Sequence, residues 1–192
     1  MDDIYAPKID LPGDVQYNPS GNKGVSGHLI DFIQTLVVFG AIFATIYLFI
    51  AQPHKVSGNS MVPTFHHGDY ILTDKLSYRF GEPKRSDIIV LKNPRDPSQD
   101  FIKRIVAVPN DNIKIENNKI YLNGLQIKEN YLPSDIVTPV GNFINEGSTV
   151  RLGASQYIVF GDNRPHSSDS REWGAVTMEQ IVGKVFFRYW PL

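Results

Sequence analysis

An uncharged apolar run from Thr35 to Ala51 constrains this chain more than any other feature. With its N-terminal flank, the run reaches roughly the 20 residues that cross the hydrocarbon core of a bilayer as an α-helix. Apolar side chains would lie on every face of that helix, while Asp31 and Gln34 lie only at its entry end, so a buried core helix is the weaker interpretation. We therefore predict a transmembrane helix over residues 28–52.

A cleaved secretory signal is the other interpretation of this run. The run follows a long polar segment, and its exit AQPHK lacks a small-x-small cleavage site, so an uncleaved anchor is favoured. Residues 1–27, with several Pro and Gly, are expected to form a disordered tail. The charges of Lys8, Lys23 and Lys55 do not decide the orientation, although a large outer domain is permitted because such domains translocate largely regardless of charge.

Composition limits what residues 53–192 can form. The chain has 192 residues, 42% of them hydrophobic, which suffices for one sizeable core in a single domain. A formal net charge of -1 and a pI near 6.5 provide no electrostatic surface for nucleic acid. The absence of cysteine excludes a disulfide framework and a thiolate zinc site.

Short runs rich in β-branched and aromatic residues predict a mainly β domain after the apolar run. Asn117-Asn118 is expected to form a tight hairpin and Asn123-Gly124 a second turn. The spacing of Thr177 and Gln180 is typical of a capping box and predicts one short helix. Strands are expected over Tyr70–Thr73, Ile88–Leu91, Phe101–Val108, Ile113–Glu116, Ile120–Asn123, Tyr157–Phe160 and Val182–Trp190.

The first candidate for catalytic chemistry is Ser60, in the segment Val56–Thr64 just beyond the apolar run. Gly58 permits unusual backbone angles and Pro63 fixes another, so Ser60 can be presented on a rigid turn with its amide free for an oxyanion. The alternative is an ordinary turn serine. Val62 stands where the nucleophile elbow of an α/β-hydrolase requires glycine, so that class does not fit.

Other nucleophile and base combinations are weaker. The Ser-x-x-Lys spacing of Ser20 and Lys23 falls in the Gly- and Pro-rich tail and is interpreted as chance. Adjacent histidines in a polar turn are usually solvated. We retain two alternatives. One is a catalytic triad whose base is His66, His67 or His166, together with Asp69 or Asp162; the other is a metal site built on the same three histidines.

Lys103 is the second unusual residue. Strand alternation places Phe101, Lys103, Ile105 and Ala107 on one face, so a lysine shares an apolar surface. Such a lysine often lies on an edge strand, where its charge prevents pairing with another chain and its amine extends to water. If it is buried instead, desolvation disfavours the ammonium form, and the lowered pKa provides a neutral amine that can act as a base.

The third segment, Gly161–Gly174, is densely polar and directly follows the apolar run Tyr157–Phe160. A solvated loop is one interpretation, because Gly, Asn, Ser and Asp favour turns. Two arginines and two aspartates at short spacing favour the other, a loop ordered by bidentate ion pairs beside an active site.

Together, an N-terminal anchor, GNSMVPT, FIKRIV and the pattern GDNRxxSxDSRxWG resemble the type I signal peptidase family from about Ile33 to the C-terminus. The resemblance implies an antiparallel two-sheet β domain with a single N-terminal transmembrane helix. It also implies an endopeptidase that removes signal peptides from secretory precursors after small residues. We expect the catalytic domain on the extracytoplasmic side of the plasma membrane, no metal or organic cofactor, no nucleic-acid partner, and a monomer working on preproteins at the bilayer.

Carried over residue by residue, the resemblance makes Ser60 the nucleophile and Lys103 its general base. It implies that the Ser167 hydroxyl orients the lysine amine, that Asp162 pairs with Arg104, and that Asp169 and Arg171 brace the same loop. The oxyanion hole is expected at Ser60 and Gly58, and the substrate pockets at Val56, Ser57, Met61, Phe65, Phe101 and Ile102.

The chain departs from the family pattern at two places. Some members have a serine at the position of Gly58, whose hydroxyl donates to the oxyanion; here a water or Ser57 would have to replace it. Pro165-His166 replaces the more usual Asp-Asn pair, which leaves the partner of Arg164 open.

Two rival functions remain. A soluble Ser-Lys peptidase of the self-cleaving repressor type shares the dyad, but the apolar run at Thr35–Ala51 speaks against it. A membrane-anchored β domain that only binds peptides would carry the same residues without activity.

Overall fold

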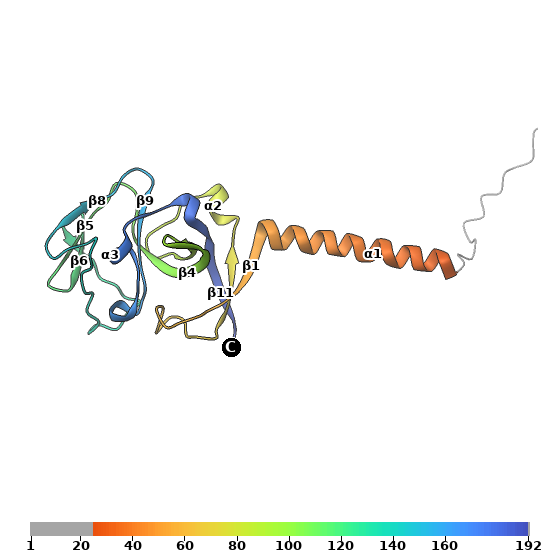
Figure 1. Ribbon diagram of the computed structural model, residues 1–192, viewed down its shortest axis with the longest axis horizontal. Coiled ribbons are helices and arrows are strands. Elements are labelled where there is room, and N and C mark those ends of the chain that lie inside the picture. Colours follow the sequence, from red (N-terminus) through yellow and green to blue (C-terminus); the bar gives the residue numbers. More distant parts are fainter. Residues whose placement is uncertain (1–24, 192) are drawn as a thin grey trace, which may run out of the picture. The chain divides into compact units, whose positions relative to one another are not determined.

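The computed structural model describes residues 25–191, and the chain divides into two compact units, residues 1–42 and 43–192 (Figure 1). Helix α1 (Val25–Thr45) continues as the π-helix η1 (Ile46–Ile50). Within the described residues, this is the one helix long and apolar enough to cross a membrane, and none of its residues is buried. The expected tail lies outside the described residues except for 25–27, which begin α1, and Ala51 and Gln52 belong to the following strand.

The β unit contains a seven-stranded sheet in the order β1-β2-β11-β3-β4-β9-β10, in which every neighbouring pair is antiparallel. Its longest strand, β4, carries Lys103 and pairs with β3 on one side and β9 on the other. The strands are β1 (Ala51–Lys55), β2 (Tyr70–Asp74), β3 (Ile88–Asn93), β4 (Asp96–Ala107), β9 (Gln156–Phe160), β10 (Val176–Thr177) and β11 (Ile181–Trp190).

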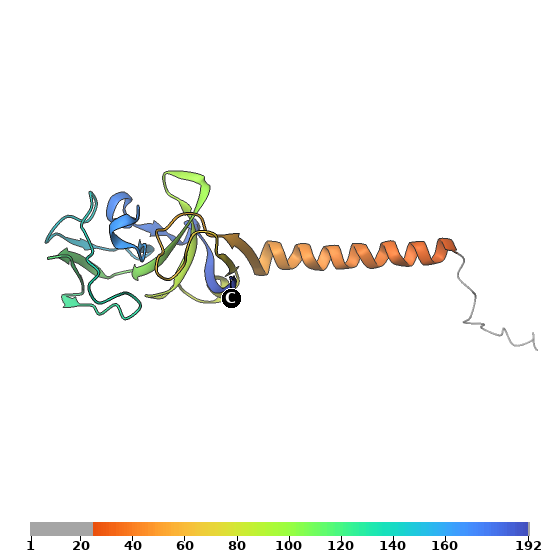
Figure 2. The ribbon, with the colours of Figure 1, turned by 90° about the horizontal axis from the view of Figure 1, so that it is seen from below.

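A smaller antiparallel sheet has the order β7-β6-β5-β8, with β5 (Asn112–Glu116), β6 (Lys119–Leu122), β7 (Leu125–Gln126) and β8 (Thr149–Arg151). Two-residue turns connect its first three strands, since Glu116 pairs with Lys119 and Leu122 with Leu125. The predicted turn residues all have positive φ, as such tight hairpins require: Asn117 52°, Asn118 60°, Asn123 53° and Gly124 84°. Within the β unit, these strands lie beyond β9 and α3 (Ser170–Trp173) as seen from β1 (Figures 1 and 2).

Three buried clusters form the core. One fills the space between the sheets and includes Ile113, Ile115 and Phe160; a second lies under the Ser60 segment and includes Met61 and Val90. A third, on the other face of the large sheet, includes Ile89, Leu91, Phe101 and Ile105. The alternation of Ile89, Val90 and Leu91 between clusters is the period-2 pattern of a strand buried on both faces.

The expected alternation in β4 is wrong at its C-terminal end. Ala107 packs with Val106 in the cluster between the sheets rather than with Phe101 and Ile105. The reason is a register shift, because Ile105 pairs with Val159 whereas Ala107 already pairs with Ile158. A β-bulge of this kind places one extra residue in the strand and reverses the side to which later residues point.

The mainly β, two-sheet architecture confirms the predicted fold class, and the strands predicted from alternation appear within a few residues of their expected bounds. The capping box of Thr177 and Gln180 is present at the 3₁₀ helix η3 (Met178–Gln180). Strands β1, β7, β8 and β10 were not predicted. Strand β1 contains Pro53, which a strand tolerates here because β1 lies at the sheet edge. The remaining short helices are α2 (Ser77–Phe80) and η2 (Arg164–His166).

Gly183 in β11 tests the packing of the large sheet. An added Cβ would lie 2.5 Å from the Asp74 carbonyl oxygen and 2.9 Å from Thr73 Cγ2, and β2 cannot retreat because it is paired with β11 there. We expect Gly183→Ala to destabilise the domain by about 1–3 kcal/mol, measured as a lower midpoint of thermal unfolding of the detergent-solubilised chain.

Gly153→Ala is the matched control for Gly183→Ala. Its added Cβ would meet only the exposed Gln156 side chain, at 3.3 Å from Oε1. Oε1 accepts the Gly153 amide at 2.8 Å, and a shift of a few tenths of an ångström relieves the contact while keeping that hydrogen bond. Equal unfolding midpoints for the two variants would contradict the tight packing at Gly183.

Candidate active site

The segment between β1 and β2 presents Ser60 on a turn. Gly58 has φ of 92°, a left-handed conformation that favours glycine, and its amide donates to His67 Nδ1 at 3.1 Å. Met61, directly after Ser60, is buried in the cluster under the segment, and the Phe65 amide donates to its carbonyl at 2.9 Å. The turn is therefore held at both ends, with the half-buried Ser60 between them.

Lys103 reaches Ser60 from β4. Its side chain is 3% exposed, and its Nζ lies 2.9 Å from Ser60 Oγ and 5.2 Å from the centre of the Phe101 ring. Desolvation by burial, with a smaller contribution from Arg171, lowers the pKa of Lys103 from 10.5 to about 8, against the attraction of Asp169 and Asp162. A useful fraction of the amine is therefore neutral near pH 7.

The polar segment after β9 closes over the Ser60 turn. The Asn163 amide donates to the Ser60 carbonyl at 2.9 Å, and Asn163 Nδ2 donates to the Asn59 carbonyl at 3.0 Å. At Gly161 an added Cβ would overlap the Ser167 hydroxyl and lie 2.5 Å from the Ser60 carbonyl oxygen. This backbone approach is possible only for glycine. Ser167 Oγ is buried there and makes no hydrogen bond within the described residues.

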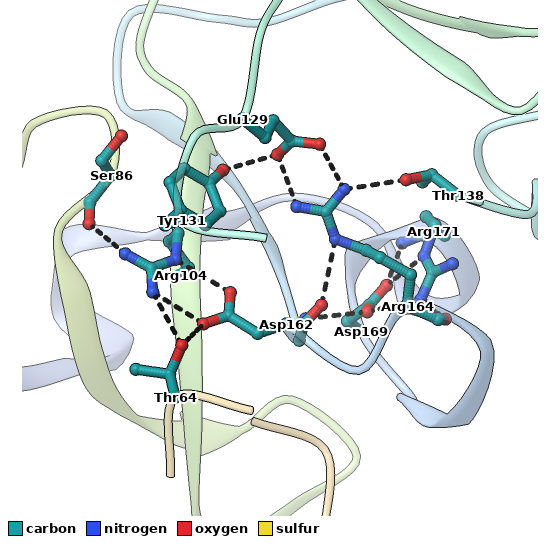
Figure 3. Close-up of polar contacts among 11 residues, drawn as sticks. Thr64, Ser86, Arg104, Glu129, Tyr131, Thr138, Asp162, Arg164, Asp169 and Arg171 are labelled. Carbon is teal, nitrogen blue, oxygen red and sulfur yellow. Dashed lines mark hydrogen bonds and ion pairs between the residues drawn. The ribbon is translucent and has the colours of Figure 1, made fainter. Parts of the chain in front are cut away.

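Arg104, next to Lys103, pairs with Asp162 (Figure 3). Its Nε and Nη2 donate to the two carboxylate oxygens at 2.8 and 2.6 Å, and Nη1 donates to the Ser86 carbonyl at 3.0 Å. Thr64, four residues after Ser60, donates its hydroxyl to the same carboxylate and accepts from Arg104. Because Asp162 is fully buried, this bidentate pair fixes β4 to the polar segment and, through Thr64, to the Ser60 turn.

Asp169 and Arg171 form a second buried pair within the polar segment. Arg171 Nε and Nη2 each donate to the carboxylate at 2.8 Å, and Arg171 Nη2 also donates to the Arg164 carbonyl at 2.7 Å. Asp169 also caps α3 and accepts the Gly161 amide at 3.0 Å. The segment is therefore ordered by internal ion pairs and is not a solvated loop.

Arg164, whose partner the sequence left open, pairs with Glu129. Its two terminal nitrogens donate to both oxygens of Glu129 at 2.6 and 2.5 Å, and Nη1 also donates to Thr138 Oγ1 at 2.8 Å (Figure 3). Sequence reasoning missed Glu129 and Thr138 because both lie in an irregular polar stretch without a recognisable motif.

A cleft of about 290 Å³ opens beside the Ser60–Lys103 contact. Five of the six expected pocket residues line it, namely Val56, Ser57, Met61, Phe101 and Ile102. Phe65 does not line it and is instead buried in the cluster beneath the turn. His54, Lys55, Val90, Asp100, His166 and Ser168 complete the lining together with the Gly58–Ser60 turn and Lys103.

The histidines considered as alternative bases form no hydrogen bond with Ser60 within the described residues. His67 Nδ1 accepts the Gly58 amide, the His66 amide donates to Asp69, and His166 lines the cleft. In the same part of the chain, no three His, Asp or Glu side chains are grouped so as to hold a metal ion. Ser20 and Lys23 lie outside the described residues.

Comparisons with known proteins agree on one family. The family model described as signal peptidase, peptidase S26, matches residues 29–190. A probable signal peptidase I-2 of Synechocystis sp. is 33% identical over 83% of this chain and 72% of its own length. A signal peptidase I of Bacillus caldolyticus is 39% identical over 78% of this chain and 85% of its own length.

Among solved structures, a signal peptidase I from Enterococcus faecalis V583 is 29% identical, with a TM-score of 0.47 over 55% of this chain and 98% of the other. Since the family model covers all three motif segments and both sheets, the chain belongs to the signal peptidase family S26, a family of serine endopeptidases.

Proposed function

We propose that this protein is a membrane-bound signal peptidase that removes N-terminal signal peptides from secretory precursors after small residues, using Ser60 as nucleophile and Lys103 as base. The observation that carries the proposal is the 2.9 Å contact between the buried Lys103 amine and the Ser60 hydroxyl. An alcohol and an amine in that contact, beside an open cleft, are the parts that acyl transfer to serine requires.

In the proposed reaction, the neutral Lys103 amine takes the Ser60 proton while Oγ attacks the scissile carbonyl carbon. The ammonium then gives that proton to the leaving amine as the C–N bond breaks, and an ester to Ser60 remains. A water activated by the same amine hydrolyses the ester. With a pKa of about 8, roughly a tenth of Lys103 is neutral at pH 7, which is adequate for turnover.

The Ser60 amide is the proposed first donor to the oxyanion. Within the described residues it donates to no other group, and Ser60 is only half-buried, so the amide is available. The Gly58 amide already donates to His67, which argues against Gly58 as the second donor. Either Ser57, which lines the cleft, or a water would supply that hydrogen bond.

The supporting roles follow from the contacts. Asp162 and Arg104, and Asp169 with Arg171, hold the polar segment against the turn and the base strand. Ser167 is proposed to orient the amine, since its buried hydroxyl forms no hydrogen bond within the described residues, to Lys103 or to any other group, and is free to form one. Each of these residues acts by position rather than by bond exchange.

The helix Val25–Ile50 is the proposed membrane anchor, with the catalytic domain outside the cytoplasm. Ser60 lies ten residues after Ile50, so the chain can place it at most about 35 Å from the end of the helix. An anchored enzyme meets membrane-embedded precursors at a raised effective concentration. We expect the monomer to be the working unit.

Replacement of the nucleophile tests the function directly. Ser60→Ala should lower cleavage of a precursor with small residues before its cleavage site by a factor of about 10³ or more, because Ser60 carries the hydroxyl that is hydrogen-bonded to Lys103 in the described residues. The measurement is precursor processing by the detergent-solubilised chain. Equal processing by wild type and variant would exclude Ser60 as nucleophile, whereas no processing by either would leave the peptide-binding alternative.

The pH dependence tests the base. Because the pKa of Lys103 is lowered to about 8, kcat/KM should rise with pH and reach half of its limit near pH 8. Lys103→Arg keeps the charge but should abolish turnover at every pH in this range, since guanidinium does not deprotonate. A midpoint near pH 4 or 6.5 would point to a carboxylate or a histidine instead.

The burial of Lys103 should also cost stability. Above pH 10.5 the amine is neutral in both states and contributes nothing; as pH falls, the unfolded chain is protonated first. Below pH 8 the folded state therefore bears the full cost of about 3 kcal/mol. Lys103→Met should raise the unfolding midpoint at pH 7, and the gain should vanish near pH 10.5. A gain that does not depend on pH would show that packing, not charge, is responsible.

A further inference from the structure

Two residues outside the three motif segments contact the arginines behind the catalytic pair. Glu129 and Tyr131 belong to the irregular stretch between β7 and β8, and the Tyr131 hydroxyl donates to Glu129 Oε1 at 2.5 Å. In Figure 3 this pair lies between Arg104 and Arg164. We call Glu129 and Tyr131 the latch.

Glu129 is the carboxylate that neutralises Arg164. The Arg164 side chain is fully buried, and both of its terminal nitrogens donate to Glu129. Burial alone would lower the pKa of Arg164, but its hydrogen bonds to Glu129 raise the pKa instead. A guanidinium at this depth needs a paired carboxylate, because leaving one charge of a buried pair alone is strongly destabilising.

Tyr131 covers Arg104. The Arg104 guanidinium carbon lies 4.0 Å from the centre of the Tyr131 ring, a distance typical of cation–π stacking. The edge of the same guanidinium pairs with Asp162, so its face is covered by the ring while its donors are held by the carboxylate. The ring therefore keeps water from the ion pair next to the base.

Both arginines are connected to the reacting groups through short paths. Arg104 directly follows Lys103 and donates to Thr64, on the Ser60 turn. Arg164 Nε donates to the Gly161 carbonyl at 3.1 Å, and Gly161 packs against Ser167 and the Ser60 carbonyl. A shift of either guanidinium would therefore move the turn or the segment that covers it.

We propose that Glu129 and Tyr131 are positioning residues, which hold Arg104 and Arg164 so that the Ser60 turn and Lys103 stay in register for reaction. The inference rests on the proposed function of the Ser60–Lys103 pair. It assigns to a segment from the smaller sheet a role in catalysis without contact to substrate.

The pKa of Lys103, read as the midpoint of the pH–activity profile, distinguishes a positioning role from simple structural support. Loss of folded protein would lower the activity without moving that midpoint. Asp162 and Asp169 raise the pKa of Lys103, whereas burial and Arg171 lower it. If the latch is lost, Arg104 is held less firmly against Asp162, so the Asp162 charge is less compensated. Water also gains access to the ion pair next to Lys103. Both effects favour the ammonium form, so a higher pH is then needed for the same activity.

The test is cleavage of a precursor with small residues before its cleavage site, by the detergent-solubilised full chain between pH 6.5 and 9.5. For Glu129→Gln and Tyr131→Leu we expect kcat to fall about 10- to 100-fold with KM within a factor of about two, because misplacement affects the reacting atoms. The midpoint of the pH profile should rise by about 0.5 or more. Tyr131→Phe keeps the ring over Arg104, so it should retain kcat within about threefold and an unchanged midpoint.

Asp135→Asn is the matched control, an exposed carboxylate in the same stretch, and should behave as wild type. Wild-type kcat and midpoint in Glu129→Gln and Tyr131→Leu would overturn the proposal. So would an activity loss that only follows the loss of folded protein, at an unchanged midpoint. If Tyr131→Leu does not fold, the midpoint of Glu129→Gln decides. Activity of Ser60→Ala in the same assay would instead overturn the proposed function and is scored separately.

Discussion

The site depends on a primary amine kept away from water against an alcohol. Lys103 lies in the longest strand, β4, which pairs with β3 on one side and with β9 on the other. Water therefore does not reach the buried Lys103 from either neighbouring strand. The Ser60 turn and the polar segment close the remaining side, with Asn163 holding the Ser60 carbonyl. Removal of any of these layers would hydrate the amine and raise its pKa toward the ordinary value of a lysine.

The charge pairs around the lysine explain how a polar site can still lower the pKa of an amine. Two buried carboxylates, Asp162 and Asp169, lie close enough to stabilise an ammonium. Each is paired with its own arginine, so much of its field is cancelled before it reaches Lys103. Desolvation then outweighs the remaining attraction, and the pKa falls rather than rises. The arginines thus help to keep the pKa of Lys103 low without contacting its amine.

Local sequence rules predicted much of this molecule because they act over a few residues. Period-2 alternation located the long strands, and paired Asn or Asn-Gly residues located the two-residue turns of the smaller sheet. Ser60 and Lys103 were identified as a pair from three short motifs that no single pattern would have joined. The distance between their side chains depends on the tertiary fold, which alternation and turn chemistry do not predict.

What could not be predicted arises from contacts between distant segments. Glu129 and Tyr131 look like ordinary loop residues until the chain returns to bring them against Arg164 and Arg104. Strand β1 was not predicted because the apolar run continues into it, and because Pro53 disfavours strand structure except at the edge of a sheet. Phe65 was expected in the cleft, but the turn after Met61 directs it into the core.

The register shift near the end of β4 has an effect on how the domain holds together. Residues up to Ile105 belong to the interior of the large sheet, whereas Val106 and Ala107 help to form the layer shared with the smaller one. A single continuous strand therefore joins two hydrophobic interiors, and Lys103 lies a few residues before the junction. The two interiors share this strand, so a change that loosens one would disturb the other. An insertion or deletion in this strand would displace the amine from its alcohol, so changes in chain length are tolerable only in the connecting loops.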